Sequence, residues 1–298
     1  MAIPIGEISV GEFQTSNAVR EMGDALECAG IDACYVTDHP APDAAWLHAS
    51  GHDALDPFTA LSFIAATTSR LCLHTNILVM AYRNPFITAK AAASLQTLSG
   101  GRLILGVGAG YQQGEFEALG VDFYKRGKLF DEALDVIRLA WAGGPVVFEG
   151  TTFNAAGNEP RPAPNPAPPI WIGGGSDKAI ERAARFGDGW SPFFAAPSMS
   201  KLNQESGIHT VEQLSDKIAT LQDLRAKLGK HSPFDIAIGP KPKLHYQKAG
   251  GADEYLEAVR ELAGAGVTWC MVDPPHPNRQ AYIENVQWFG EEVVNRLA

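Results

Sequence analysis

The chain has 298 residues, of which 45% are hydrophobic, so it is long enough for one large α/β barrel or two smaller domains. Its 24 lysines and arginines face 34 aspartates and glutamates, and the resulting net charge of −10 argues against nucleic acid as the main partner. Four scattered cysteines without a CxxC pair exclude a disulfide framework, and no apolar run approaches the ~20 residues of a membrane span.

The amino-terminal segment MAIPIGEISVGEF does not have the pattern of a secretory signal. It lacks a basic start, and Glu7 interrupts its apolar residues. We therefore expect a cytoplasmic protein that does not associate with a membrane.

Strand and helix patterns alternate through the first half of the chain. Short apolar runs predict strands, amphipathic runs predict helices, and two of the helices open with a cap residue followed by proline. In chain order we expect a helix from Ser16 to Gly30, a strand at 33–37, a helix opened by Asp56-Pro57, a strand at 71–74, a helix opened by Asn84-Pro85, a strand at 102–108 and a helix at 128–144.

The second half continues this alternation after the stretch PRPAPNPAPP, which suits a stiff connector better than a recognition segment. We expect strands at 170–172, 189–191, 234–238 and 269–272, and helices after Ser176, at 211–228, at 253–263 and up to about Leu297. About eight βα units result, with strands apolar on both faces, as in a parallel sheet under helices. The sequence therefore predicts a (β/α)8 TIM barrel with loop insertions, as a single domain over residues 1–298. A doubly wound open sheet is the structural rival.

Three strand ends carry residues that suit a site at the mouth of a barrel. Asp38-His39 follows the strand predicted at 33–37 and forms either a proton-handling pair or a simple cap in a proline turn. GGGS at 173–176 opens a helix and forms either a phosphate pocket or a tight turn with Ser176 as the cap. GVGAG at 106–110 is a weak glycine pattern that does not match the dinucleotide fingerprint.

Two other kinds of catalytic site are not expected. His39, His48, His52 and His74 show no metal-binding spacing such as HExxH, so we predict no metal site. A serine-hydrolase elbow is also unexpected, because the sequence contains no GxSxG.

Several stretches in order resemble the bacterial luciferase-like flavin and deazaflavin oxidoreductases, and most of all the actinobacterial members that use coenzyme F420. They are VTDH, YRNPFITAKAAASLQTLSGGRLILGVGAG, FDEAL, PPIWIGGGS and AARFGDGW, which together run from about Ile31 to Trp190. The resemblance implies a βα barrel with the cofactor ring across its mouth, and a homodimer.

The resemblance also implies the positions of the site residues. Asp38 and His39 would lie near the ring as the catalytic residues, and a cis peptide bond at Asn76–Ile77 would place backbone against one ring face. The cofactor phosphate would lie against Gly173, Gly174, Gly175 and Ser176, while Gly108, Ala109 and Gly110 would line another side of the cofactor. Tyr111 stands where the sugar-phosphate dehydrogenases of the family have Glu, which argues against their substrate.

We therefore expect a coenzyme F420-dependent oxidoreductase that transfers hydride between F420 and a small organic substrate. An FMN-dependent luciferase-like monooxygenase that uses O2 is the first alternative, and a flavin-binding protein without turnover is the second. The substrate contacts are expected in residues 41–53, 192–209 and 240–251, where the resemblance is poorest.

Overall fold

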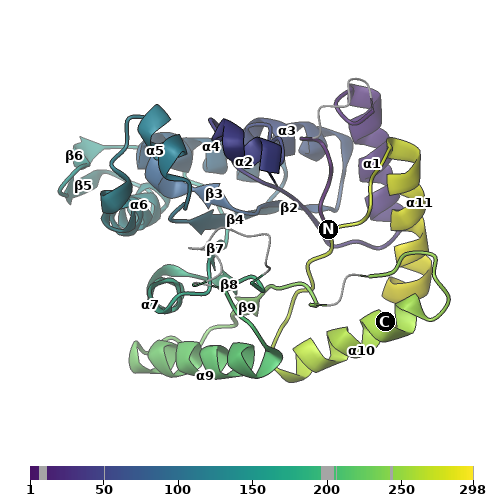
Figure 1. Cartoon of the computed structure of the whole chain (residues 1–298). Coiled ribbons are helices and arrows are strands. Elements are labelled where there is room, and N and C mark those ends of the chain that lie inside the picture. The colour runs from purple at the N-terminus through teal and green to yellow at the C-terminus, as the bar shows by residue number, and fades with distance from the viewer. Residues whose placement is uncertain (7–11, 50, 196–204, 206, 242–243, 298) are drawn as a thin grey trace.

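The computed structural model describes residues 1–6, 12–49, 51–195, 205, 207–241 and 244–297. It has an α/β fold in which helices surround a parallel sheet (Figure 1). The sheet follows the order β1-β2-β4-β7-β8-β9, and β3 pairs with β4. Its strands are β1 (Ala33–Val36), β2 (Cys72–Thr75), β3 (Leu78–Val79), β4 (Leu103–Gly108), β7 (Ile170–Gly173), β8 (Gly189–Ser191) and β9 (Asp235–Ile236).

Within the described residues, isolated contacts alone continue the sheet beyond β1 and β9. Ala2 bridges Tyr35 in parallel, and its N–H donates to Val272 O at 2.8 Å. Trp269 bridges Ala237, but the strand that we expected at 269–272 does not form a regular ladder. Pro274 and Pro275 follow after Asp273, and proline has no N–H with which to extend a ladder. The parallel α/β fold is confirmed, whereas a complete eight-stranded barrel is not.

Most helices begin and end close to the expected positions, but α2 and α5 were not predicted. The helices are α1 (Ser16–Cys28), α2 (Ala44–Ala49), α3 (Pro57–Thr67), α4 (Pro85–Leu98), α5 (Gln113–Ala118), α6 (Arg126–Trp141), α7 (Asp177–Phe186), α9 (Val211–Lys227), α10 (Gly251–Gly264), α11 (Arg279–Phe289) and α12 (Asn295–Leu297), with shorter turns η1 (Met80–Tyr82), η2 (Phe123–Lys125) and η3 (Gly290–Val294).

The expected cap residues are present at three of these helices. The side chains of Asp56, Asn84 and Ser176 each accept a hydrogen bond from a backbone N–H of the first turn. At α1 the expectation was wrong by one residue, because Thr15 is the cap and accepts from Ala18 N at 3.1 Å.

A small antiparallel hairpin lies between α6 and β7, where no strands were predicted. Its strands are β5 (Val146–Glu149) and β6 (Asn154–Asn158). A single carboxylate on α6 holds its turn, because Glu132 Oε1 accepts from Thr152 N at 2.9 Å and from Phe153 N at 2.7 Å. This partner lies 20 residues earlier in the chain, so local sequence does not reveal it.

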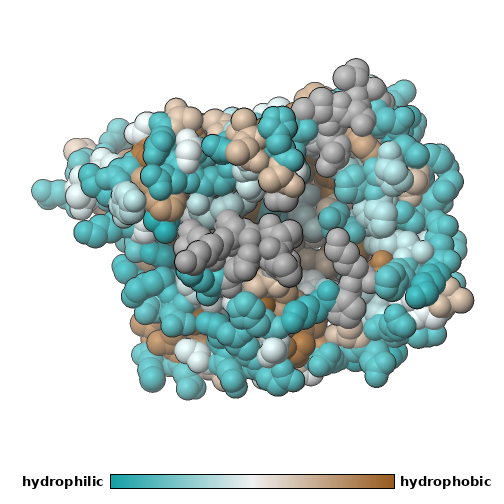
Figure 2. Space-filling model, in the orientation of Figure 1, coloured by the Kyte–Doolittle hydropathy of each residue, from teal (hydrophilic) through white to brown (hydrophobic). Residues whose placement is uncertain are grey.

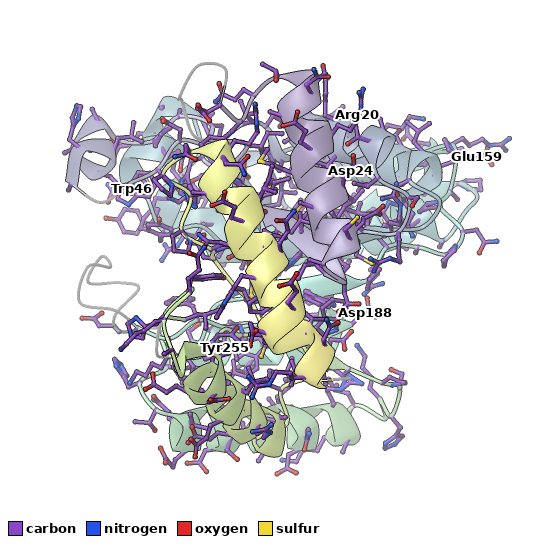
Figure 3. All side chains as sticks on the ribbon, turned by 90° about the vertical axis from the view of Figure 1, so that its right-hand side faces the viewer. Arg20, Asp24, Trp46, Glu159, Asp188 and Tyr255 are labelled. Carbon is purple, nitrogen blue, oxygen red and sulfur yellow. The ribbon has the colours of Figure 1, made fainter. Side chains whose placement is uncertain are left out.

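The core lies between the sheet and its helices, and the large side chains of Trp190, Tyr282 and Phe130 are fully buried there. α1 and α11 pack side by side although they stand at opposite ends of the chain (Figure 3). The outer face drawn in Figure 2 is mostly hydrophilic. Among the described helices, none combines the length and the hydropathy that a membrane crossing requires.

Candidate functional site

Asp38 follows the carboxyl end of β1 and joins two loops. Its side chain is buried, and Oδ2 accepts from Val79 N at 2.9 Å. Arg83 Nη2 donates to Asp38 Oδ1 at 2.6 Å, while Arg83 Nη1 lies 3.6 Å from Asp56 Oδ2. Burial raises the pKa of the Asp38 carboxyl, and the Arg83 guanidinium and the Val79 N–H offset only part of this shift. Asp38 therefore fixes the loop after β2 against the loop after β1.

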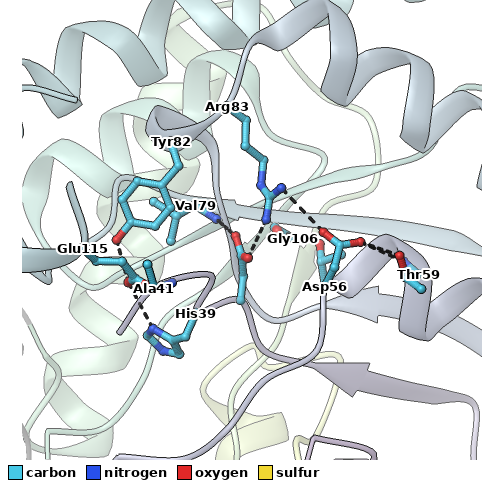
Figure 4. A network of polar contacts seen from close by, with 11 residues as sticks. His39, Ala41, Asp56, Thr59, Val79, Tyr82, Arg83, Gly106 and Glu115 are labelled. Carbon is cyan, nitrogen blue, oxygen red and sulfur yellow. Dashed lines mark hydrogen bonds and ion pairs between the residues drawn. The ribbon is translucent and has the colours of Figure 1, made fainter. Parts of the chain in front are cut away.

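Glu115, in the first turn of α5, is a fully buried carboxylate with three donors around it. Tyr82 OH donates to Oε2 at 2.8 Å, Ala41 N donates to Oε1 at 3.0 Å, and His39 Nδ1 lies 3.3 Å from Oε2 (Figure 4). Burial alone would raise the pKa of Glu115, but the hydrogen bonds from His39, Ala41 and Tyr82 outweigh it, so the pKa lies below its usual value. Glu115 is therefore a carboxylate at neutral pH.

The carboxylate determines which ring nitrogen of His39 carries the proton. An ionised carboxyl only accepts, so His39 Nδ1 donates to Glu115 and the neutral ring keeps Nε2 as an acceptor. Gln112 Nε2 lies 3.1 Å from the same Nδ1, but an amide nitrogen only donates, so it forms no hydrogen bond with a protonated Nδ1. The side chain of His39 is only 9% exposed, and its ring centroid lies 4.5 Å from that of Trp46. The arrangement holds one oriented imidazole nitrogen that can take up or release a proton.

The bulge after β2 contains the cis peptide bond at Asn76–Ile77 that the resemblance implied, and this expectation is confirmed. The side chain of Ile77 points across the ends of β4 and β7. A Cβ atom on Gly173 would lie 1.8 Å from Ile77 Cδ1, and one on Gly108 would lie 3.1 Å from Ile77 Cγ2. Packing of Ile77 therefore already explains the glycine at 173, whether or not a ligand also approaches it.

The turn from Gly173 to Ser176 joins β7 to α7. Gly174 has a φ of +97°, which favours glycine, and its N–H donates to Ser191 O at 3.3 Å. Trp190 Nε1 donates to Gly174 O at 2.8 Å, so both backbone groups of this residue are occupied. The donors that an anion would meet here therefore begin after Gly174, at the first turn of α7.

Gly110 allows the chain just before Glu115 to pack closely against its neighbours. It has a φ of +79°, and a Cβ atom there would lie 2.6 Å from Val79 Cγ1 and 2.9 Å from Phe116 Cε2. This close approach packs the start of α5 against β3. The expectation that Gly108, Ala109 and Gly110 line a cofactor is not tested by this packing and stays a prediction.

A cavity of about 390 Å³ opens at the carboxyl ends of the first strands. Its lining includes Thr37, His52, Asn76 and His276, and the ring centroid of His52 lies 5.2 Å from that of His39. Of the expected catalytic and cofactor-binding residues in the described chain, Asn76 alone is part of this lining, and His52 and Asp53 come from the expected substrate segment 41–53. Over the same described ranges, three or more His, Cys, Asp or Glu residues do not come together as a possible metal site.

The structure thus brings Asp38, His39 and Asn76 to one edge of the sheet, and it adds residues that sequence reasoning missed. Glu115, Tyr82 and Arg83 were not assigned, although a glutamate soon after GVGAG was a visible signal for Glu115. The expected substrate segments are described only in part, since residues 50, 196–204, 206 and 242–243 lie outside the described chain.

Comparison with known proteins supports one family. A family model for luciferase-like monooxygenases matches residues 5–204. A chain of unassigned function from Mycobacterium tuberculosis is 29% identical and covers 93% of this chain and 94% of its own. The F420-dependent glucose-6-phosphate dehydrogenase of Microbacterium testaceum is 30% identical and covers 80% of this chain and 72% of its own. The crystal structure of monooxygenase RslO1 from Streptomyces bottropensis has a TM-score of 0.78 at 19% identity, over 100% and 99% of the two chains.

Proposed function

This chain belongs to the luciferase-like monooxygenase family and is an oxidoreductase, and from this premise we propose that it transfers hydride between coenzyme F420 and a small organic substrate. The observation that carries the proposal is the oriented His39–Glu115 pair beside the Asn76–Ile77 bulge, at the carboxyl edge of the sheet. The F420 dependence of the relative from Microbacterium testaceum supports the choice of cofactor. Tyr111 favours a substrate other than the sugar phosphate of that relative.

The residues at this edge fit a deazaflavin with a phosphate-bearing tail. Backbone at Asn76 and Ile77 would support one face of the ring, and the first turn of α7 beyond Gly174 would hold the phosphate. A bound deazaflavin supplies hydride chemistry, and the protein supplies position and electrostatics. His39 Nε2, with Nδ1 held by Glu115, would hold or move the proton that accompanies the hydride.

Titration of the purified protein with F420 and, separately, with FMN tests the cofactor. We expect a saturable change in F420 fluorescence and a much weaker response to FMN. Tight FMN binding without F420 binding would overturn the proposal in favour of the FMN-dependent monooxygenase. Binding of F420 without hydride transfer to any substrate in a broad panel would favour the flavin-binding protein without turnover.

The place of the phosphate has its own test in two isosteric variants. Gly174→Asn and Gly174→Asp introduce side chains of the same size at the same backbone φ of +97°, so they differ mainly in charge. We expect Gly174→Asp to bind F420 at least ~10-fold more weakly than Gly174→Asn, because its carboxylate would repel the phosphate. Equal affinities would contradict a phosphate at this turn.

The role of His39 is tested by a split between turnover and affinity. With any substrate that the panel reveals, His39→Ala is expected to lower turnover by ~100-fold or more and cofactor affinity by much less. Equal losses in both would assign His39 to packing.

The proposal includes a closed eight-stranded ring and a homodimer. The contacts of Ala2 with Tyr35 and Val272, together with the Ala237–Trp269 bridge, support closure of the ring. Two apolar side chains on neighbouring outer helices support a dimer, since Phe63 on α3 is 52% exposed and Ile87 on α4 is 71% exposed. Light scattering should give a dimer for the wild type and a monomer for Ile87→Glu, and a monomeric wild type would contradict the proposal.

A further inference from the structure

A second cavity, of about 710 Å³, reaches into the sheet from the amino ends of its strands. Its inner wall includes Tyr35 of β1, His74 of β2 and Trp171 of β7, and its outer wall includes Tyr255 of α10. Figure 3 shows Tyr255 on α10 close to the lower end of α11. We call this space the inner cavity. It is distinct from the 390 Å³ cavity at the opposite strand ends, and Tyr35 is the residue that lines both.

The inner cavity holds polar atoms that have no partner within the protein. Across the described residues, five buried side-chain nitrogen or oxygen atoms lack a hydrogen bond, and three of them belong to its lining. These three are His74 Nε2, Trp171 Nε1 and Tyr255 OH. Buried polar groups in native proteins are nearly always hydrogen-bonded, so three such atoms around one space indicate an occupant that supplies their partners.

The aromatic side chains around these atoms are fixed by packing. Trp171 is 2% exposed, and its ring centroid lies 4.9 Å from that of His74 and 5.4 Å from that of Trp269. Gly106 leaves room for the imidazole, because a Cβ atom there would lie 2.5 Å from His74 Nε2. The polar atoms therefore stand at fixed places in an aromatic wall, which is the arrangement expected of a small-molecule site.

The charge of the lining defines the class of occupant. Burial lowers the pKa of His74 to about 3, so its ring is neutral at physiological pH, and the phenol of Tyr255 is also neutral. Asp32 is the charged side chain of the lining, and it lies exposed at the rim beside the amino end of β1. The amino terminus of Met1 also belongs to the lining, but burial lowers its pKa to about 6, so it is mostly neutral at pH 7. A charged ligand would therefore lose its hydration in this space without gaining a full opposite charge.

We propose that the inner cavity is a second ligand site, which takes a small, uncharged, mostly aromatic or aliphatic molecule with one hydrogen-bond acceptor for Trp171 Nε1. The volume of about 710 Å³ lies within the range of small-molecule sites. The inference does not depend on the identity of the redox cofactor, because the cofactor edge lies at the other ends of the strands.

Two probes of nearly the same size test the polar part of this site. Acetophenone carries a carbonyl oxygen, and ethylbenzene is the analogue without it. We expect saturable, submillimolar binding of acetophenone by calorimetry or ligand-observed NMR, and binding of ethylbenzene that is about tenfold weaker, which one hydrogen bond can supply. The variant Trp171→Phe should reduce this preference. Equal affinities of the two probes for the wild type would overturn the polar part of the proposal.

Cavity-filling variants locate the binding. Cys270→Phe places a ring in the inner cavity, and Cys28→Phe makes the same change at an exposed position of α1. We expect Cys270→Phe to weaken acetophenone binding at least tenfold and Cys28→Phe to leave it unchanged. Ala263→Trp at the exposed rim gives a second block that is safer for folding. Unchanged binding in both blocking variants, or no saturable binding of either probe to the wild type, would overturn the proposal.

Discussion

Substitutions of Glu115 distinguish what the charge of its buried carboxylate contributes from what its shape contributes. The side chain has Tyr82 OH at 2.8 Å, Ala41 N at 3.0 Å and His39 Nδ1 at 3.3 Å as donors. Glu115→Gln keeps the shape, and we expect its oxygen to face Ala41, because a backbone N–H cannot accept. Its amide NH2 then faces Tyr82 and His39. The tyrosine hydroxyl can turn to accept, and His39 Nδ1 must also accept, so the ring proton moves to Nε2.

The expected loss of stability follows from the hydrogen-bond partners that remain in each variant. Glu115→Ala leaves three donors unpaired at about 1–3 kcal/mol each, partly offset because a buried carboxylate is removed, so we expect a loss of about 3–5 kcal/mol in the free energy of unfolding. Glu115→Gln keeps partners for all three groups but exchanges charge-assisted hydrogen bonds for neutral ones. Its expected cost is about 1–2 kcal/mol.

Urea unfolding and the 15N chemical shifts of the His39 ring measure these effects. Because the folded pKa of Glu115 lies below its unfolded value, the carboxylate contributes stability that is present above about pH 4.5 and lost as the pH falls through the folded pKa. The stability difference between wild type and Glu115→Gln should therefore shrink in acid. A His39 ring with the same protonated nitrogen in both proteins, or a glutamine variant as unstable as the alanine variant, would refute the reasoning.

Three further predictions concern close packing and charge at the same edge of the sheet. Gly106→Ala should lower the free energy of unfolding by about 3 kcal/mol or prevent folding, because its Cβ atom would lie 2.1 Å from a backbone oxygen. The control Gly264→Ala, whose Cβ atom would have nothing within 4 Å, should be neutral or slightly stabilising. Gly173→Ala should lower the free energy of unfolding by about 1–3 kcal/mol alone, and by clearly less in an Ile77→Val background, where the clashing Cδ1 is absent. If urea unfolding shows that the losses from the two substitutions simply add, Gly173 and Ile77 do not pack as described. Arg83→Met should cost about 3 kcal/mol, because it leaves a buried carboxylate without its cation, and an unchanged unfolding midpoint would show that this ion pair contributes nothing.

Local chemistry explains the features that the sequence predicted. The caps at Asp56, Asn84 and Ser176 were visible because a cap bonds to N–H groups only two or three residues away. The strand Leu103–Gly108 was visible because a strand buried on both faces is a continuous apolar run. The cis bond at Asn76–Ile77 was anticipated from family resemblance alone.

Contacts between residues far apart in the sequence explain the features that the sequence did not predict. Glu132 holds a hairpin turn 20 residues later, and Glu115 reaches back 76 residues to His39, so neither partnership is encoded in a local pattern. Hydrophobic period and cap chemistry act over a few residues, so the alternating α/β pattern with Asp38 and His39 at a strand end follows from local sequence. The packing of Ile77 against Gly173 and the effect of Glu115 on the His39 proton follow from the folded chain, because close approach and buried hydrogen bonds depend on which distant segments fold against one another.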